Sequence, residues 1–136
     1  MQTVKDVVAA ILIKDNKILI AQRGHDDPLA GLWEFPGGKV EAGESPQQSL
    51  VREMREEFCI EVEVVEFFAS SLFTYEKGTI RLLAYFCCWA GGELWPQVHS
   101  DHAWVRSSQL ADFTFAPADR PLVEKLTQEF PGLGSN

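Results

Sequence analysis

The sequence has little cysteine, no long apolar run and no excess of positive charge. Its three cysteines, Cys59, Cys87 and Cys88, lack CxxC spacing, and their odd number fits reduced thiols rather than a disulfide framework. No apolar run approaches the roughly 18 residues that a transmembrane helix needs. The N-terminus also lacks a basic segment followed by an apolar one and a cleavage site. We therefore expect a cytoplasmic protein with no membrane partner.

The shortage of positive charge also limits the partners. Lys and Arg together number 12 against 20 Asp and Glu, which gives a formal net charge of −8. A field of this sign repels duplex nucleic acid and anionic membranes at long range. A small polyanionic substrate would bind only where metal ions, or a few well-placed Lys and Arg side chains, offset its charge.

The apolar pattern predicts a single domain over residues 1–136. Val4 to Ile13 is almost continuously apolar, which is typical of a strand covered on both faces. Further strands are expected at 18–22, 32–35, 60–68, 70–75, 80–89 and 103–105, and helices at about 46–58 and 118–129. This arrangement predicts an α/β fold in which a mixed sheet is sandwiched between helices. The last residues, Pro131 to Asn136, are expected to form a frayed tail.

The first helix has the clearest local signals. Ser45 is the predicted N-cap, Pro46 occupies the first helical position, and Gln48 completes a capping box. Apolar residues at three- and four-residue spacing then predict one buried stripe, made of Leu50, Val51, Met54 and Phe58.

The same helix carries three carboxylates on one face. Glu53, Glu56 and Glu57 stand at i, i+3 and i+4, where like charges destabilise a helix, and they lie near its C-terminus, where anions are unfavourable. One interpretation is a solvated face on which Arg52 pairs with Glu56. The other is a site for Mg²⁺ or Mn²⁺, which prefer oxygen ligands and often combine carboxylates with substrate phosphates. Backbone carbonyls of the upstream Gly37-Gly38 turn can add to such a site.

The residue spacing favours the metal site. The run from Gly38 to Ile60, GKVEAGESPQQSLVREMREEFCI, resembles the Nudix box over 23 residues. One position departs from the motif, because Cys59 stands where the family has glycine. If that residue takes a left-handed conformation after the helix, a cysteine costs on the order of 1 kcal/mol. Outside the box, three segments resemble MutT-like nucleoside triphosphate pyrophosphohydrolases: Ala21-Gln22-Arg23, the LWEFPGGK run at 32–39, and Ala116-Pro117-Ala118-Asp119.

The resemblance implies a Nudix fold and a metal site of known composition. By similarity, Glu53, Glu56 and Glu57 bind Mg²⁺, for which Mn²⁺ can substitute, with help from the backbone of Gly37 or Gly38. Glu53 is also a candidate for orienting or deprotonating water, although the identity of the general base stays open. Glu44 is expected to support the loop or an outer-sphere metal, and Arg52 to hold the glutamates. A further carboxylate is expected from the late loop, with Asp101 as the first candidate and Glu93 as the second.

The resemblance also implies a nucleotide-binding region. Lys39 and Arg23 are candidates for phosphate contact, with a surface cation at a strand end as the alternative for Arg23. Asp119 and Phe35 are expected beside the nucleobase, although Asp119 would alternatively only cap the last helix. We expect His99 and His102 to be solvated loop residues rather than zinc ligands, because they lack a third soft ligand.

Three functions are compatible with these residues. The leading prediction is hydrolysis of (deoxy)nucleoside triphosphates to the monophosphate and pyrophosphate, which would remove 8-oxo-dGTP or act on modified or unmodified cytidine nucleotides. The second is hydrolysis of RNA 5′-triphosphate ends or of dinucleotides. The third is a non-catalytic nucleotide-binding domain, which is disfavoured because such domains lose acids from the box. We expect a monomer or a homodimer.

Overall fold

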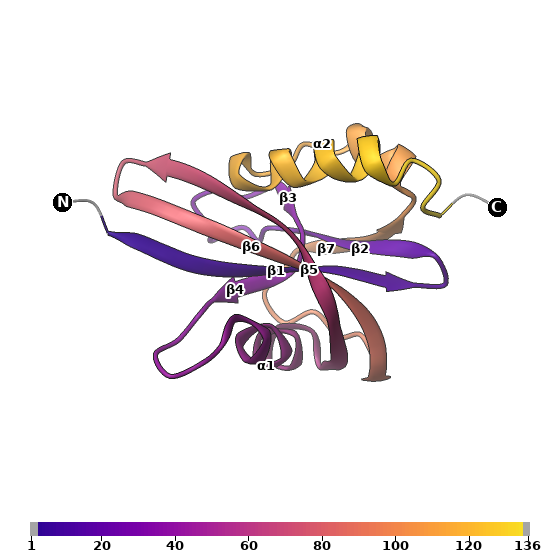
Figure 1. The fold of residues 1–136 in the computed structure, drawn as a ribbon, viewed down its shortest axis with the longest axis horizontal. Helices are drawn as coiled ribbons and strands as arrows, with labels where there is room; N and C mark the ends of the chain where they lie inside the picture. Colours follow the sequence, from indigo (N-terminus) through magenta and orange to yellow (C-terminus); the bar gives the residue numbers. More distant parts are fainter. Residues whose placement is uncertain (1–2, 135–136) are drawn as a thin grey trace.

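A seven-stranded mixed sheet lies between two α-helices in the computed structural model, which describes residues 3–134 (Figure 1). The elements are, in chain order, β1 (Val4–Lys14), β2 (Lys17–Gln22), β3 (Trp33–Glu34), β4 (Gly37–Lys39), α1 (Pro46–Phe58), β5 (Ile60–Tyr75), β6 (Gly78–Gly92), β7 (Asp101–Val105), the 3₁₀ helices η1 (Ser107–Asp112) and η2 (Pro117–Asp119), and α2 (Arg120–Glu129). The helices α1 and α2 cover opposite faces of the sheet, so the α/β prediction is confirmed.

Strand β1 lies at the centre of the sheet. It pairs in parallel with β6 and antiparallel with β2 and β4, and the strand order is β3-β2-β1-β6-β5. Its successive side chains point to opposite faces: Val8, Ala10 and Leu12 pack in the core beneath α1, whereas Ala9 and Ile11 pack in the core beneath α2. A strand buried on both faces explains the unbroken apolar run in the sequence.

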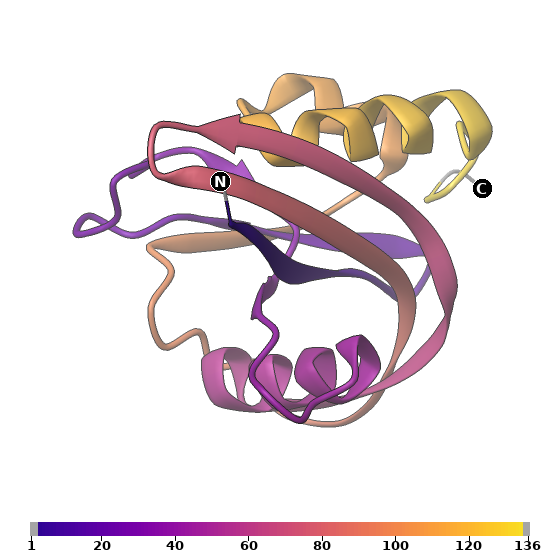
Figure 2. The same cartoon turned by 60° about the vertical axis from the view of Figure 1, so that its left-hand side comes forward.

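The hairpin of β5 and β6 is longer than the sequence predicted. Residues 60–75 form one strand instead of two, and one of its register shifts, between Phe67 and Ala69, lies where a break was expected. Such irregularities bend a strand, and Figure 2 shows the hairpin curving from the side of α1 to the side of α2. Strand β6 also continues past its predicted end at Trp89, because Gly91 and Gly92 pair with the start of β5.

Helix α1 spans the predicted residues, and its N-terminus is formed as predicted. The Ser45 hydroxyl accepts from the backbone N–H of Gln48, and the Gln48 side chain accepts from the backbone N–H of Ser45. Leu50, Met54 and Phe58 are buried on the sheet side. Helix α2 begins two residues later than predicted, because residues 117–119 form a 3₁₀ turn.

The prediction of a frayed tail is wrong for residues 131–134. The backbone N–H of Ser107 donates to the carbonyl of Leu133 over 2.9 Å, and the Leu133 side chain packs against the core beneath α2. Ser135 and Asn136, which the prediction also included, lie outside the described residues. Between residues 3 and 134, no helix combines the length and apolar character that a membrane span requires.

Candidate active site

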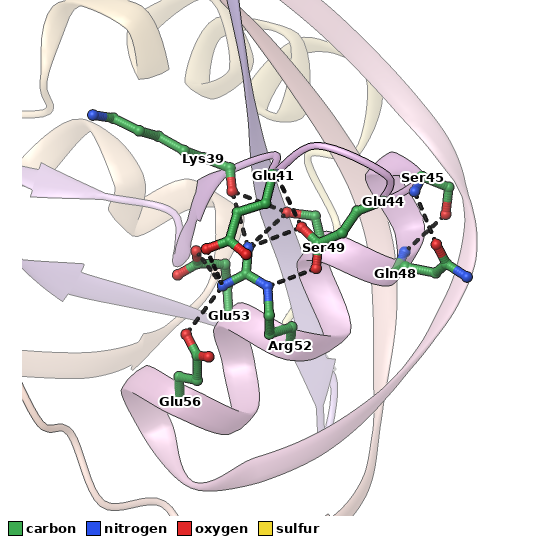
Figure 3. A network of polar contacts seen from close by, with 9 residues as sticks. All are labelled: Lys39, Glu41, Glu44, Ser45, Gln48, Ser49, Arg52, Glu53 and Glu56. Atoms are coloured by element: carbon green, nitrogen blue, oxygen red, sulfur yellow. Dashed lines mark hydrogen bonds and ion pairs between the residues drawn. The ribbon is translucent and has the colours of Figure 1, made fainter.

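Arg52 gathers the carboxylates at the junction of β4 and α1 (Figure 3). Its Nε lies 2.6 Å from Glu44, and its Nη1 lies 3.0 Å from both Glu53 and Glu56. Its Nη2 donates to the backbone carbonyl of Lys39, which ties the end of β4 to the helix. The predicted pair of Arg52 and Glu56 therefore exists within a larger network, and the solvated-face interpretation describes only its outer edge.

Glu44 is the principal acceptor of Arg52. Its second oxygen accepts from Arg52 Nη2 and from the backbone N–H of Glu41. These hydrogen bonds, the one from Arg52 first, lower the pKa of Glu44 to about 2. Glu44 thus stays ionised and fixes both the loop before α1 and the guanidinium that orients the other glutamates. Glu44 therefore supports the loop, and a role toward an outer-sphere metal stays a prediction.

The two glycines of β4 allow close approach on two different sides. A Cβ added to Gly37 would lie 1.8 Å from the carbonyl oxygen of Val8, so glycine permits the pairing with β1. A Cβ added to Gly38 would lie 2.3 to 2.6 Å from all three carboxyl atoms of Glu53. The Gly38 position is therefore glycine because the Glu53 carboxylate occupies the space where a side chain would stand.

Glu57 is half-buried, as Glu53 is, whereas Glu56 is exposed. Burial, followed by repulsion from Glu53, raises the pKa of Glu57 to about 7, while the nearby His99 partly opposes this shift. Burial also raises the pKa of Glu53, and the hydrogen bond from Arg52 lowers it. Two half-buried carboxylates whose charged forms are disfavoured are a setting in which a cation would be strongly attracted.

The oxygen donors of the site are of the type that a hard divalent cation prefers, but they do not converge on one point. Carboxylates and the glycine backbone supply only oxygen, which suits Mg²⁺ or Mn²⁺. Within residues 3–134, no three His, Cys, Asp or Glu side chains converge into a ready cation site. Glu56 is turned toward Arg52 and its side chain is 60% exposed, so it is free to reorient. Magnesium usually keeps several waters and takes only one or two carboxylates together with substrate phosphates. The site therefore does not need three converging carboxylates.

The structure gives Cys59 the left-handed conformation that was predicted for it. Cys59 is the C-cap of α1, with φ 60° and ψ 29°, and its backbone N–H donates to the carbonyls of Met54 and Arg55. The helix therefore ends normally despite the missing glycine, at the conformational cost of a side chain in this region.

Arg23 is held by carboxylates. It forms a paired contact to Asp27, with Nε and Nη2 each 2.8 Å from a carboxylate oxygen, and its Nη1 lies 2.6 Å from Glu34. Its donors thus point at protein acceptors in this arrangement. Phosphate contact by Arg23 remains a prediction.

His99 is buried, so the expectation of a solvated loop histidine is wrong for this residue. Its side chain is 4% exposed, its Nε2 lies 2.7 Å from Glu34, and its ring stacks on Phe58 with centroids 5.0 Å apart. The loop could pack this way because the Phe58 ring and the Glu34 carboxylate together offer an apolar surface and one polar partner. In the sequence, His99 stands in a polar loop, and that position predicts neither the contact with Phe58 nor the contact with Glu34.

Asp119 stands at the N-cap position of α2, but its side chain does not cap the helix. It is 6% exposed, and its Oδ2 accepts from the backbone N–H of Phe35 over 3.0 Å. It makes no side-chain hydrogen bond to the helix N-terminus, so the capping alternative is wrong. Burial raises the pKa of Asp119 to about 8, so near neutral pH the carboxyl is largely protonated and can donate as well as accept.

The side chains of the remaining candidates lie apart from the network around Arg52. Phe35 is 2% exposed and packs against Phe115, so its link to Asp119 is through its backbone. The Lys39 side chain extends away from Arg52 in Figure 3. Asp101 is exposed at the start of β7, where its carboxylate accepts from the backbone N–H of His102, and Glu93 is exposed after β6.

The sequence analysis did not predict that Glu34 and His99 belong to the polar network around Arg23. Glu34 was treated only as part of a strand, and His99 only as a loop residue. Glu34 connects Arg23 to His99 through its two oxygens. A charged residue within the short LWEF strand was the one available signal, since a glutamate between two aromatic residues has to find polar partners when the strand is buried.

The fold has a β-sheet between two helices, and the helix that carries the carboxylates follows a strand with two glycines. Comparison with known proteins identifies the class to which this combination belongs. Residues 4–126 match the family model described as NUDIX domain. The chain belongs to the Nudix family of hydrolases.

Named relatives place it more closely. It is 44% identical over 119 residues to the CTP pyrophosphohydrolase of Escherichia coli (strain K12), covering 88% of each chain. It is 32% identical to the 8-oxo-dGTP diphosphatase of the same strain, covering 93% of this chain and 98% of the relative. The solution structure of the E. coli ORF135 protein superposes with a TM-score of 0.83 at 41% identity and covers 96% of this chain and 95% of that chain.

Proposed function

We propose that the protein is a Mg²⁺-dependent pyrophosphohydrolase that converts (deoxy)nucleoside triphosphates to the monophosphate and pyrophosphate. The observation that carries this proposal is the half-buried Glu53 carboxylate, which lies against the side-chain-free face of Gly38, with the half-buried Glu57 on the same face of α1. Relatives named for CTP and for 8-oxo-dGTP support the substrate class.

The metal site would consist of Glu53, Glu56 and Glu57 with the backbone of Gly38. When bound there, a divalent ion supplies charge neutralisation of phosphate oxygens and a lowered pKa for coordinated water. Arg52 keeps Glu53 and Glu56 within reach of the site, and Glu44 keeps Arg52 in place. A carboxylate of the set that is free of the ion would accept the proton of the attacking water.

The nucleobase would be read near Asp119. A buried, protonated carboxyl offers one donor and one acceptor, as an amide does, and the backbone N–H of Phe35 holds its orientation. Such a pair of groups suits the N3 acceptor and the amino N–H of cytosine as well as the carbonyl-bearing edge of an oxidised guanine. The proposed role is therefore removal of altered nucleotides or turnover of cytidine nucleotides.

The test is pyrophosphate release with Mg²⁺ across a panel of CTP, dCTP, 5-methyl-dCTP, 8-oxo-dGTP and dGTP. We expect hydrolysis of at least one of these substrates, and a loss of about 100-fold or more in Glu53→Gln. Glu63→Gln changes an exposed carboxylate on β5 and serves as the matched control. Full activity in Glu53→Gln would show that the site is assigned to the wrong residues, and an inactive wild-type protein would refute the proposed reaction.

A further inference from the structure

His99 makes contacts that an ordinary packing residue would not need. Its imidazole is almost completely buried, its Nε2 lies 2.7 Å from the Glu34 carboxylate, and its ring stacks on Phe58 with an angle of 23° between the planes. At 2.7 Å one of the two atoms carries a proton, and because the Glu34 carboxylate also accepts from Arg23, we assign the donor role to Nε2.

The other ring nitrogen has no partner. Among residues 3–134, His99 Nδ1 is the one buried side-chain nitrogen or oxygen without a hydrogen bond. Leaving such an atom buried costs about 1–3 kcal/mol. A phenylalanine would stack on Phe58 without this cost, so packing alone does not explain an imidazole at this position.

The loop that carries His99 is fixed to the end of the carboxylate helix. The backbone N–H of Gln97 donates to the carbonyl of Glu57 over 2.8 Å, and the backbone N–H of Trp95 donates to the carbonyl of Phe58 over 2.9 Å. His99 then stacks on Phe58, the residue next to Glu57. The imidazole and its loop therefore contact the turn of α1 on which Glu57 stands.

The hydrogen-bond partner of His99 belongs to another element of the fold. Glu34 belongs to β3, and the next residue, Phe35, donates its backbone N–H to Asp119. The second oxygen of Glu34 is held by Arg23. A continuous path of contacts thus runs from the buried carboxyl of Asp119, through β3 and the imidazole, to the end of α1.

We propose that His99 is a positioning residue that holds Glu57 at the reaction site by joining the Glu34 carboxylate of β3 to the C-terminal turn of α1. The role of Glu57 at a reaction site rests on the proposed function. The contacts of His99 by themselves join β3 to α1. The imidazole acts through Glu57 and does not itself touch the reacting atoms.

Two substitutions separate the hydrogen bond from the packing. His99→Phe keeps the ring on Phe58 and removes the donor to Glu34. His99→Gln places an amide nitrogen near the position of Nε2 and removes the stacking. His25→Gln is the control, since His25 is an exposed histidine between β2 and β3. For each protein, kcat and KM are measured on the best nucleotide, and Tm is measured with and without Mg²⁺.

We expect His99→Phe to lower kcat by about 10- to 100-fold, with KM within about threefold and Tm close to that of the wild type. His99→Gln should recover a large part of kcat even if its Tm is lower. The rise in Tm on adding Mg²⁺ should shrink in His99→Phe and persist in His25→Gln, because a displaced Glu57 binds the ion more weakly.

Two results would overturn the proposal. Unchanged kcat and an unchanged Mg²⁺ response in His99→Phe would make the imidazole a packing residue. Loss of kcat in both His99 variants in proportion to their loss of Tm would make its role purely structural. If the wild-type protein hydrolyses no nucleotide, the proposed function fails, whereas the Mg²⁺-dependent shift in Tm still decides whether His99 positions Glu57.

Discussion

Substituting alanine at the two adjacent glycines of β4 should separate catalysis from folding. Both residues have ordinary negative or extended backbone angles, so alanine is allowed by the backbone at each. They differ only in what a new Cβ would meet. At Gly38 it meets the end of the Glu53 side chain, and at Gly37 it meets the backbone of β1.

In Gly38→Ala the Glu53 carboxyl has to retreat. Its nearest atom would lie 2.3 Å from the new Cβ, so the group must move by about 1 Å to reach the 3.4 Å of an ordinary contact. A side chain can make that movement at a cost of about 1 kcal/mol or less, whereas a misplacement of about 1 Å in an active site costs about 100-fold in rate. We expect kcat/KM to fall about 100-fold while Tm changes by only a few degrees.

In Gly37→Ala the obstacle is the carbonyl oxygen of Val8, 1.8 Å from the new Cβ. Relief requires the pairing of β4 with β1 to open, and we expect a loss of more than about 3 kcal/mol in the free energy of unfolding. Gly91→Ala is the control, because a Cβ there meets no neighbouring atom.

The assays are nucleotide hydrolysis and thermal unfolding followed by circular dichroism. If Gly38→Ala kept kcat/KM within twofold of the wild type, the place of the Glu53 carboxylate would not matter for catalysis. If Gly38→Ala and Gly37→Ala lost the same stability, the distinction between side-chain and backbone obstacles would be wrong.

Three further predictions concern single groups. Cys59→Gly should raise the free energy of unfolding by up to about 1 kcal/mol, measured by urea denaturation, because Cys59 has a positive φ of 60°; a loss of stability would contradict the strain assigned to it. In the folded protein Asp119 keeps its proton up to a pKa of about 8, whereas in the unfolded chain it loses that proton above about pH 4. Its burial therefore makes stability fall as pH rises from about 4 to 8, by at most about 1.4 kcal/mol per pH unit; Asp119→Asn should flatten this slope, and an unchanged slope would show that Asp119 is ionised in the fold. Mg²⁺ should raise the Tm of the wild type, by an amount equivalent to about 2.7 kcal/mol at 100 times the dissociation constant, and a chelator should reverse the effect. Glu57→Gln should lose most of the Mg²⁺ effect, and an undiminished rise would remove Glu57 from the ion's ligands.

Local features were predictable wherever neighbouring residues decide the conformation. The capping box at Ser45 and Gln48 forms between residues three apart, so the start of α1 could be placed to the residue. The left-handed Cys59 followed from its place after the last helical turn. The two-sided burial of β1 followed from its unbroken apolar run.

Misjudged features depend on residues far apart in the chain. Glu34 and His99 are 65 positions apart, and Phe35 and Asp119 are 84 apart. Neither contact leaves a periodic signal, because each joins single residues on separate elements. The fixed tail at Leu133 is a similar case, since its partner Ser107 lies in η1.

From the sequence by itself, the class of the protein followed from the 23-residue run that resembles the Nudix box. The shared face of the helix carboxylates followed from helical spacing, which is a property of consecutive residues. Only the tertiary structure decided which charges the fold tolerates and where. It buried Asp119 and raised its pKa, engaged Arg23 with two carboxylates, and enclosed His99 between Glu34 and Phe58. The physical reason is that desolvation and ion pairing depend on the distances between elements that only the packed sheet and helices define.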